Sequence, residues 1–589
     1  MRTIQTDVLV VGGGGAGFRA AIGAREKDAS AVLVSKGPLA RSGASPMAGA
    51  DLTCHGLGMR RAGFFGEPRD SEEKFFSDIV HQGCFLNDQR LVEIYVHDGP
   101  DRLLETLAWG CKPRFCDERA IFTSGTGIMD AHLREAKRLG VELLEDVAVL
   151  ELTTDDGAVT GAIGLDIRSG ELLAFECKAA VLATGGWHKG YTPVTGSKEL
   201  TGDGVAMAYR AGAELGNMEF VTFACNIPVW PPVWRGSIIT YVMGIMCGGT
   251  LENADRERFL EKYDPETVAI AQRTEWNKSF FSNVAAQEIR AGKGSPHGGV
   301  YYVVGDEPWE AFEARAMSSY PGWQFKGGDF SEMAQMFRDG EGVEVAGAAE
   351  YFEGGVCIDE ECATNILGLY AAGECAISLF GANRVAAATM EMLVTGAIAG
   401  RAAGDYAGKA SVPAPDSKQV ATLVEKIEAP LKRGSGEPPS RLRAKLQKDS
   451  QEKLGPVRVE AELTGFLGFL AEAQSAQLPE LAVQSKSRCY NKEWIECLEL
   501  ENLLQVIELS ARAALERTES RGVHYREDFP DVDNDGWLKE IILTAGESEP
   551  CVAHREVKVT SLKPPTGVIP HFEMVKEMML AHSDVGGHH

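Results

Sequence analysis

The sequence predicts an α/β fold that begins with a Rossmann-like βαβ unit, on three observations. Residues 6–11 (TDVLVV) form a largely apolar run, typical of a strand that is buried on both faces of a parallel sheet. The glycine-rich segment GGGGAG at 12–17 follows at once and leads into FRAAIGAREK, which has helix-forming composition. A second apolar run at 31–34 completes the unit at the expected length.

The glycine-rich segment has the spacing of a dinucleotide-binding turn. Gly12, Gly14 and Gly17 satisfy G-x-G-x-x-G. Such glycines permit a tight turn and let the backbone approach a pyrophosphate, which then lies at the helix N-terminus. The strand before and the helix after the segment disfavour a plain glycine turn without ligand. The second strand ends in Ser35-Lys36 instead of an acidic residue that would bind a ribose, which argues against a simple NAD dehydrogenase.

Two distant segments strengthen this prediction. AVLATGG at 180–186 is an apolar strand that ends in glycines, a pattern common in flavoproteins with two dinucleotide folds. GLYAAGE at 368–374 is a further short strand, and it ends in Gly-Glu. We interpret the three separated segments as parts of one dinucleotide site.

Composition and cysteine usage exclude several other classes. A chain of 589 residues is too long for one core, so about two to four structural units are expected. The net charge of −26 would repel nucleic acid. No run of about 18 apolar residues and no signal peptide is evident, which predicts a cytoplasmic protein without direct membrane insertion. The 13 cysteines include no C-x-x-C pair, so no metal site is expected and iron–sulfur clusters would belong to another chain.

Motifs along nearly the whole chain resemble the flavoprotein subunits of succinate dehydrogenase and fumarate reductase, with L-aspartate oxidase and adenylylsulfate reductase as relatives. The motifs are VVGGGGAG, LVSK, ATGG, TGDGVAMAYRAGAE, GGVYYVV, GLYAAGEC, GANR, ECLELENLL and RTESRGVHYREDFPDVDNDGWL. The last of these looks like the helical domain of succinate dehydrogenase. RSGA at 41–44 also resembles adenylylsulfate reductase, but the segment after it does not follow that enzyme.

The resemblance implies a Rossmann-like FAD-binding domain with an inserted α+β capping domain and a C-terminal helical domain. The expected bounds are 1–218 and 346–415 for the FAD-binding domain, 219–345 for the capping domain, 425–545 for the helical domain and 546–589 for a C-terminal tail. Residues 412–439 suit a linker because they are rich in proline, glycine and serine. The active site would lie between the flavin ring and the capping domain, since ligand sites favour domain interfaces.

The resemblance also implies which residues bind FAD. The pyrophosphate would contact the three glycines, the adenosine and phosphates would lie near Ser35, Lys36 and Ser42, and adenine would meet Ala148. Asp203 would face the flavin side, Glu374 the ribityl or ribose chain, and Thr389 and Met390 the isoalloxazine. The full expected set is Gly12, Gly14, Gly17, Ser35, Lys36, Ser42, Gly43, Gly49, Ala148, Thr184, Gly185, Asp203, Glu374, Thr389 and Met390.

The chain departs from the family at the flavin linkage and at the dicarboxylate site. Gly43 stands where succinate dehydrogenases have the histidine that bonds FAD, so FAD is expected to bind noncovalently. FACNI at 223–227 replaces F-H-P-T-G, and no arginine occurs at 236–255, where the family has R-G-E-G-G. Glu350 replaces the histidine of H-Y-x-x-G-G, and only Arg384 remains from the anionic pocket.

These departures predict a substrate other than a small dicarboxylate. A second negative charge about 4 Å from Glu350 would cost roughly 4 kcal/mol near a protein surface, or about a thousandfold in binding. Arg384 would hold an anionic or carbonyl group, and Glu350 either carries a proton or forms an ion pair with Arg384. Arg235 either replaces part of the missing arginine or lies at the surface. An apolar set either receives a planar ligand or only packs the capping domain: Trp230, Pro231, Pro232, Trp234, Tyr241, Met243 and Met246.

The leading hypothesis is an FAD-containing subunit of a cytoplasmic oxidoreductase complex, which could be membrane-associated through its partners. It would exchange a hydride between flavin and a non-dicarboxylate substrate and pass electrons to or from iron–sulfur subunits. An electron-transfer flavin module without its own organic substrate is the alternative. Activity of the fumarate reductase, succinate dehydrogenase or adenylylsulfate reductase kind is a minor one.

Overall fold

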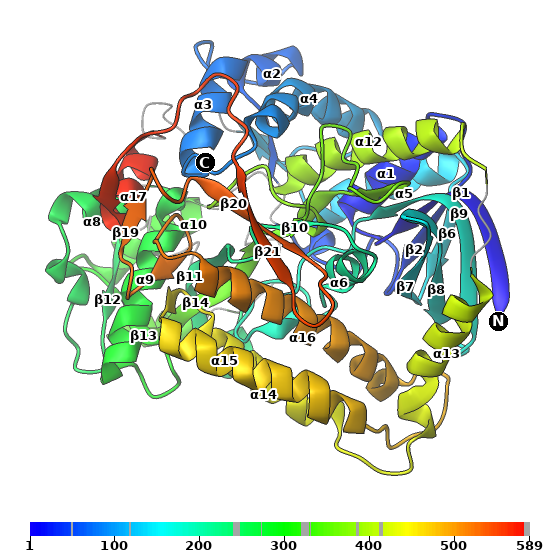
Figure 1. Cartoon of the computed structure of the whole chain (residues 1–589). Helices are drawn as coiled ribbons and strands as arrows, with labels where there is room; N and C mark the ends of the chain where they lie inside the picture. The colour runs from blue at the N-terminus through cyan, green and yellow to red at the C-terminus, as the bar shows by residue number, and fades with distance from the viewer. Residues whose placement is uncertain are drawn as a thin grey trace.

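A seven-stranded sheet forms the centre of the dinucleotide-binding part (Figure 1). The computed structural model describes residues 1–581 apart from 49–50, 117–118, 239–247, 273, 320–328, 330, 385–387 and 412–415. Five strands run parallel in the order β6-β2-β1-β9-β16, and β8 and β7 extend the sheet antiparallel from β9. The strands are β1 (Arg2–Val11), β2 (Ala31–Ser35), β6 (Glu142–Glu145), β7 (Val147–Asp155), β8 (Ala158–Asp166), β9 (Leu172–Leu182) and β16 (Leu369–Ala371). The predicted α/β fold is thereby confirmed.

Helices α1 (Gly15–Arg25) and α12 (Ala388–Ala407) pack on this sheet, and α5 (Gly125–Arg138) packs against α1. Small residues let α1 and α12 approach closely. A Cβ on Gly400 of α12 would lie 2.0 Å from the carbonyl oxygen of Ala20 in α1. The glycine therefore brings the two helices into backbone contact, because any larger side chain would force them apart.

A further group of helices and a small sheet lies between β2 and β6 in the sequence. Its members are β3 (Asp51–Thr53), α2 (Gly56–Arg61), α3 (Glu72–Gln82), α4 (Gln89–Ala108), β4 (Phe115–Cys116) and β5 (Ala120–Phe122). Arg119 lies at their centre and forms ion pairs with Asp70 and Asp78, and the side chains of all three are at most 5% exposed. Buried charges of this kind persist because they are paired.

An antiparallel sheet with helices occupies the segment that was expected to form the capping domain. Its strand order is β11-β14-β13-β12. The elements are β11 (Val221–Trp230), β12 (Gly249–Glu252), α8 (Pro265–Ala271), α9 (Lys278–Glu288), β13 (Val300–Val304), α10 (Trp309–Ser319), α11 (Ser331–Arg338) and β14 (Val343–Phe352). This is an α+β arrangement, although the exact domain bounds remain a prediction.

Four helices follow, and α14, α15 and α16 lie side by side below the two sheets in Figure 1. They are α13 (Ser417–Lys432), α14 (Pro439–Lys453), α15 (Glu460–Glu472) and α16 (Lys492–Glu516). Helix α16 also packs against α6 (Asp203–Arg210), which belongs to the dinucleotide-binding part. Helix α16 therefore contacts the dinucleotide-binding part directly through α6.

The C-terminal segments complete small sheets. Strands β20 (Lys539–Thr544) and β21 (Cys551–Glu556) join β10 (Leu215–Gly216) and β15 (Gly355–Val356). The other elements are β17 (Val457–Arg458), β18 (Tyr525–Arg526), β19 (Asp531–Asp533), β22 (Val568–Pro570) and α17 (His571–Ala581). The segment that was expected to be a tail thus contributes two strands and a helix to the fold.

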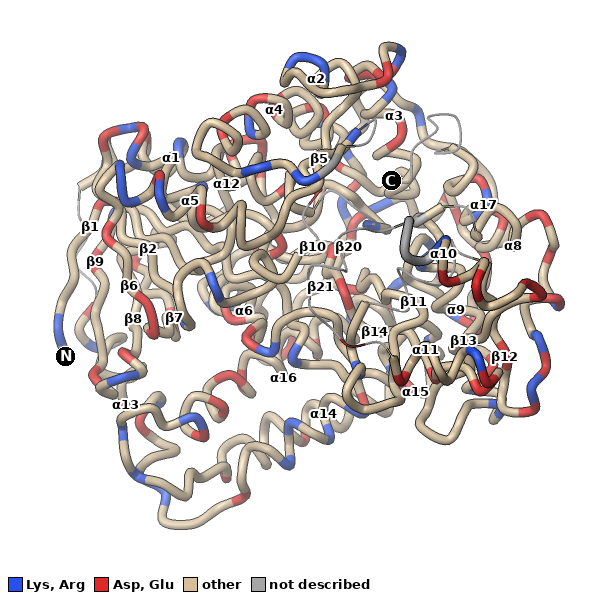
Figure 2. Tube along the Cα trace, turned by 180° about the vertical axis from the view of Figure 1, so that it is seen from behind, with Lys and Arg blue, Asp and Glu red and all other residues tan. Residues whose placement is uncertain are grey.

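The RTESRG motif forms a buried ionic cluster beside the start of β11. Arg517 Nε lies 2.7 Å from Glu219 Oε1, and Arg521 Nε lies 2.8 Å from Glu519 Oε1, with all four side chains fully buried. Arg517 also pairs with Glu519, so the cluster links the capping segment to the end of α16. Elsewhere acidic and basic positions are interspersed over the chain (Figure 2). Among the described residues, no helix is long and apolar enough to cross a membrane.

Candidate functional site

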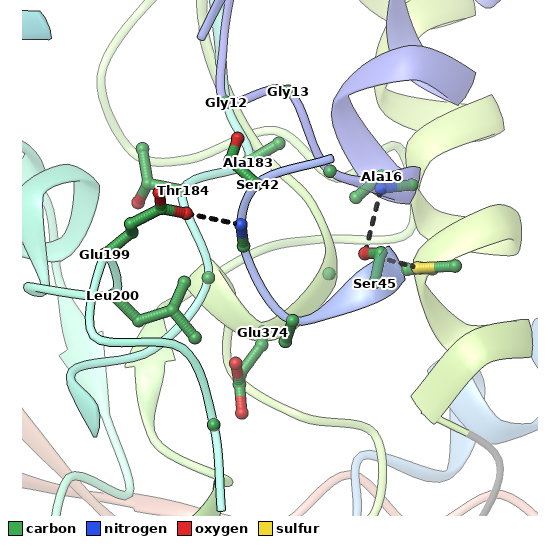
Figure 3. A pocket seen from close by; sticks show the side chains of 18 of the residues that line it. Gly12, Gly13, Ala16, Ser42, Ser45, Ala183, Thr184, Glu199, Leu200 and Glu374 are labelled. Atoms are coloured by element: carbon green, nitrogen blue, oxygen red, sulfur yellow. Dashed lines mark hydrogen bonds between the residues drawn. The ribbon is translucent and has the colours of Figure 1, made fainter. Parts of the chain in front are cut away.

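A cavity of about 330 Å³ lies at the carboxyl ends of the parallel strands. Figure 3 shows that segments from distant parts of the chain face it, including Gly12–Ala16, Ser42–Ser45 and Glu374. The residues directly after β1, β9 and β16 all line it. Ligands in open α/β sheets bind at this edge, and the volume lies within the range of cofactor sites.

The glycine-rich turn packs closely on the end of β9 and brings the start of helix α1 to the cavity. Gly12 has a φ of +121°, and a Cβ there would lie 2.2 Å from the carbonyl oxygen of Ala183. Helix α1 begins at Gly15 with no capping side chain on Gly14, so its positive end meets the cavity. Gly17 does not line the cavity. A Cβ there would lie 1.8 Å from the carbonyl oxygen of Gly12, so the close packing of the turn on α1 requires glycine at this position.

The loop after β2 lines the cavity and is anchored by two hydrogen bonds near its middle. Ser45 Oγ accepts a hydrogen bond from the backbone N–H of Gly15 at 3.1 Å. The backbone N–H of Gly43 donates to Glu199 Oε2 at 2.7 Å, as drawn in Figure 3. Gly43 has a φ of +78° and carries no imidazole, so the loop offers no histidine for a covalent flavin bond at this position.

Lys36 and Asp203 both line the cavity but bind each other. Lys36 Nζ lies 2.8 Å from Asp203 Oδ2 and 2.8 Å from Glu499 Oε1. Burial alone would lower the pKa of Lys36, but the two carboxylates outweigh it and raise this pKa above its ordinary value. Burial likewise opposes the charge of Asp203, but Lys36 and its hydrogen bonds lower the pKa of that carboxyl. Both groups are charged and paired at neutral pH.

Most of the other residues that were expected to bind FAD line the same cavity. They are Ser35, Ser42, Gly43, Ala148, Thr184, Gly185, Glu374 and Thr389. Both oxygens of Glu374 accept backbone N–H groups, from Gly186 at 3.0 Å and from Phe352 at 3.3 Å. Gly49 lies outside the described residues.

The prediction for Met390 needs correction. Its side chain is fully buried in the core among Tyr95 and Phe380 and does not line the cavity. Thr389, which was also expected here, lines the cavity together with Met392, because residues three apart share one face of a helix and residue 390 is turned away from it. Ser45 Oγ lies 3.5 Å from Met392 Sδ.

The two expected catalytic residues both line the cavity, but they do not pair with each other. Glu350 Oε2 accepts from Lys278 Nζ at 2.5 Å, whereas Arg384 forms an ion pair with Glu391 and donates to Ser378 Oγ at 2.6 Å. The expected alternative of a Glu350–Arg384 ion pair is therefore wrong. Lys278, which the sequence analysis missed, is 2% exposed.

Lys278 had only a weak signal in the sequence. It is the first residue of α9 (KSFFSNVAAQE), where a single lysine before an apolar run reads as an exposed helix end. In the structure α9 packs on β11 and β14, which turns this lysine toward Glu350 and the ring of Tyr351. Nζ lies 4.8 Å from the centroid of that ring.

A second carboxyl lies behind Arg384. Glu353 is fully buried, and its Oε1 accepts from Thr222 Oγ1 at 2.5 Å and from the backbone N–H of Arg384 at 3.2 Å. Burial raises the pKa of Glu353 to about 8, although Arg384 acts against this shift. Burial of Glu353 therefore favours its protonated form more than in an exposed carboxyl group.

The apolar set around Trp230 does not form the described wall of the cavity. Trp230, Pro231, Pro232 and Trp234 are absent from its described lining, while Tyr241, Met243 and Met246 lie outside the described residues. Trp230 stacks on His297 instead, with ring centroids 4.0 Å apart. Arg235 is exposed and also does not line the cavity. Within the described ranges, no group of three or more His, Cys, Asp or Glu side chains could hold a metal ion.

The chain is similar to known flavoproteins along nearly its whole length. The family model described as "FAD binding domain" matches residues 7–118 and 113–390, and "Fumarate reductase flavoprotein C-term" matches 443–569. The chain is 33% identical to a subunit of the CoM/CoB fumarate reductase of Methanothermobacter marburgensis, over 92% of this chain and 97% of that protein. It is 28% identical to the fumarate reductase flavoprotein subunit of Haemophilus influenzae, over 96% of each chain. The solved structure of Sdh1 from Mycobacterium smegmatis superimposes with a TM-score of 0.83, at 30% identity over 95% of both chains.

Proposed function

Since the chain belongs to the family of fumarate reductase and succinate dehydrogenase flavoproteins and is an FAD-dependent oxidoreductase, we propose that it is the FAD-carrying subunit of a cytoplasmic complex whose organic substrate is not a small dicarboxylate. Noncovalently bound FAD would supply the hydride chemistry. Electrons would pass to or from iron–sulfur subunits, and any membrane association would come through these partners.

The charge pairing in the cavity carries the substrate proposal. Its described lining contains three cationic side chains from Lys and Arg, and each has a carboxylate partner: Lys36 with Asp203 and Glu499, Lys278 with Glu350, and Arg384 with Glu391. The lining also contains five carboxylates, those of Asp51, Glu199, Asp203, Glu350 and Glu374. At the expected substrate position the cations of the described lining are Lys278 and Arg384, and each is already paired with a carboxylate, so a neutral or singly charged substrate is favoured over a dianion.

Lys278 and Glu350 are the proposed proton carriers. They are in direct contact beside the cavity, and a lysine and a carboxylate held at 2.5 Å can exchange a proton with a bound substrate. His188 Nε2 contacts the backbone carbonyl of Glu350 at 2.7 Å, which holds this strand segment in place. Arg384 would orient a carbonyl or a single anionic group of the substrate, with Glu391 and Ser378 fixing its guanidinium.

Turnover assays with the purified holoprotein test this proposal. Fumarate and succinate are compared with singly charged and neutral enoyl compounds and their saturated forms, using a redox dye as electron partner. We expect turnover of at least one singly charged or neutral compound and none of the diacids. Rapid turnover of fumarate or succinate would establish the minor alternative, a fumarate reductase or succinate dehydrogenase activity, and overturn the proposed substrate class.

The positions that replace the family's substrate ligands favour a second candidate, an electron-transfer module without an organic substrate. Ala224 and Cys225 are fully or almost fully buried in β11 and do not line the described cavity. A module of this kind would show flavin reduction by a co-purified iron–sulfur partner and no turnover with any of the tested small molecules. Dye-linked turnover by the isolated flavoprotein would contradict it.

A further inference from the structure

A polar cluster joins helix α16 to the cavity wall. Lys36 Nζ donates to three oxygens: Thr201 Oγ1 at 2.7 Å, Asp203 Oδ2 at 2.8 Å and Glu499 Oε1 at 2.8 Å. The second oxygen of Glu499 accepts from Lys189 Nζ at 2.5 Å. One carboxylate of α16 therefore holds two lysines of the dinucleotide-binding part.

A second side chain of α16 binds the other charged residue of the wall. Asn502 lies one helical turn after Glu499, and its Nδ2 donates to Asp203 Oδ1 at 2.8 Å. Asn502 Oδ1 accepts from Arg210 Nη1 at 3.0 Å, so the orientation of the amide is determined from both sides. Side chains of helix α16 thus form hydrogen bonds with both Lys36 and Asp203.

The helix itself does not reach the cofactor cavity. Lys36 and Asp203 line the cavity, whereas no residue of 492–516 belongs to its described lining. The side chains of Lys36, Asp203 and Glu499 are 20%, 16% and 10% exposed, which shields their hydrogen bonds from water. The polar contacts of Glu499 and Asn502 therefore reach the cavity wall through Lys36 and Asp203.

We propose that Glu499 and Asn502 are positioning residues for FAD, and that the docking of α16 holds Lys36 and Asp203 in the geometry that retains the cofactor. The helical segment would then control cofactor retention in addition to its part in the fold. The inference concerns the cofactor and not the substrate, so it stands apart from the proposed substrate class.

The Glu499→Gln variant separates positioning from simple charge. FAD carries a negatively charged pyrophosphate, so removal of a nearby carboxylate would tighten binding if only charge mattered. Lys36 and Lys189 bind different oxygens of Glu499, and a glutamine replaces one of these oxygens by an NH2 group, which cannot accept a hydrogen bond from a lysine. Positioning therefore predicts weaker binding, with the dissociation constant of FAD raised about tenfold.

The measurement uses the full chain, stripped of FAD and titrated with FAD while flavin fluorescence quenching is followed. Glu508→Gln is the matched control, because it removes the same charge from the same helix, where Glu508 bonds Arg512 and Gln474 away from the cavity. We expect the control to bind FAD like the wild type, and visible circular dichroism of bound flavin to change only in Glu499→Gln.

The Asn502→Leu variant is an independent test of the same proposal. If Glu499→Gln does not fold, the dissociation constant of FAD from Asn502→Leu is the test. This substitution removes the bond to Asp203 at similar volume, and it too should weaken FAD binding. Unchanged or tighter binding in a folded Glu499→Gln variant, or unchanged binding in Asn502→Leu, would overturn the inference. Because the readout is the dissociation constant, the result does not depend on which substrate the protein turns over.

Discussion

Replacing Lys278 by methionine tests the buried ion pair at the cavity. Methionine keeps an apolar stem of similar length but leaves the Glu350 carboxylate, which is only 12% exposed, without its partner at 2.5 Å. Removal of one member of a buried pair typically costs about 3–5 kcal/mol. We expect the lower end, about 3 kcal/mol of apparent unfolding free energy, because Glu350 keeps some access to the solvent of the cavity.

A double-mutant cycle isolates the pair from other effects of the substitution. Urea transitions followed by tryptophan fluorescence are compared for Lys278→Met, Glu350→Gln and the double variant. The double variant should recover about 2 kcal/mol of the summed losses, since it leaves no unpaired charge. Lys448→Met is the control, because Lys448 pairs with Glu452 on the protein surface, where the two side chains are 70% and 55% exposed, and such pairs contribute less than about 1 kcal/mol. Equal losses in Lys278→Met and Lys448→Met, or additive losses in the double variant, would refute the reasoning.

Three further predictions concern the turn and two buried titratable groups. Gly12→Ala should abolish FAD retention, measured as the ratio of flavin to protein absorbance, because its Cβ would meet the carbonyl of Ala183 at 2.2 Å; a fully loaded variant would contradict this. His132 is fully buried with its pKa lowered to about 4, mainly by burial, so its contribution to stability is complete above pH 6.5 and is lost as the pH falls toward 4. That contribution is about 3 kcal/mol, and thermal midpoints measured from pH 7 to 5 should fall less steeply in His132→Gln than in the wild type. Burial raises the pKa of Glu353 to about 8, so its contribution to stability is complete below pH 4.5 and is lost as the pH rises toward 8; the stability of the wild type relative to Glu353→Gln should therefore fall over this range, and parallel pH profiles would contradict the assignment.

Local sequence patterns were sufficient to predict the cofactor turn. The apolar run, the glycine spacing and the following helix lie within one stretch of chain, and each depends on backbone geometry that neighbouring residues determine. The distant segments ending at Gly186 and Glu374 were also recognisable, because each is a short apolar strand ending in glycine-rich sequence. The structure places all three at one edge of the sheet.

Side-chain partners could not be read from the sequence in the same way. Lys36 and Glu499 are separated by 463 positions, and Lys278 and Glu350 by 72, so no local spacing predicts that they meet. The error at Met390 had a different cause. Thr389 lines the cavity as expected, but which of its neighbours also face the cavity depends on the rotation of α12 against α1 and α4.

The glycine spacing and the apolar strand were enough to predict a dinucleotide at the N-terminus of the first helix, because both are properties of a short stretch of chain that need no distant partner. The distribution of charges in the cavity, in contrast, follows from tertiary packing. Lys278 lies beside Glu350 because α9 packs against β11 and β14. The pKa of a buried group and its contribution to stability depend on the partner that such packing places beside it.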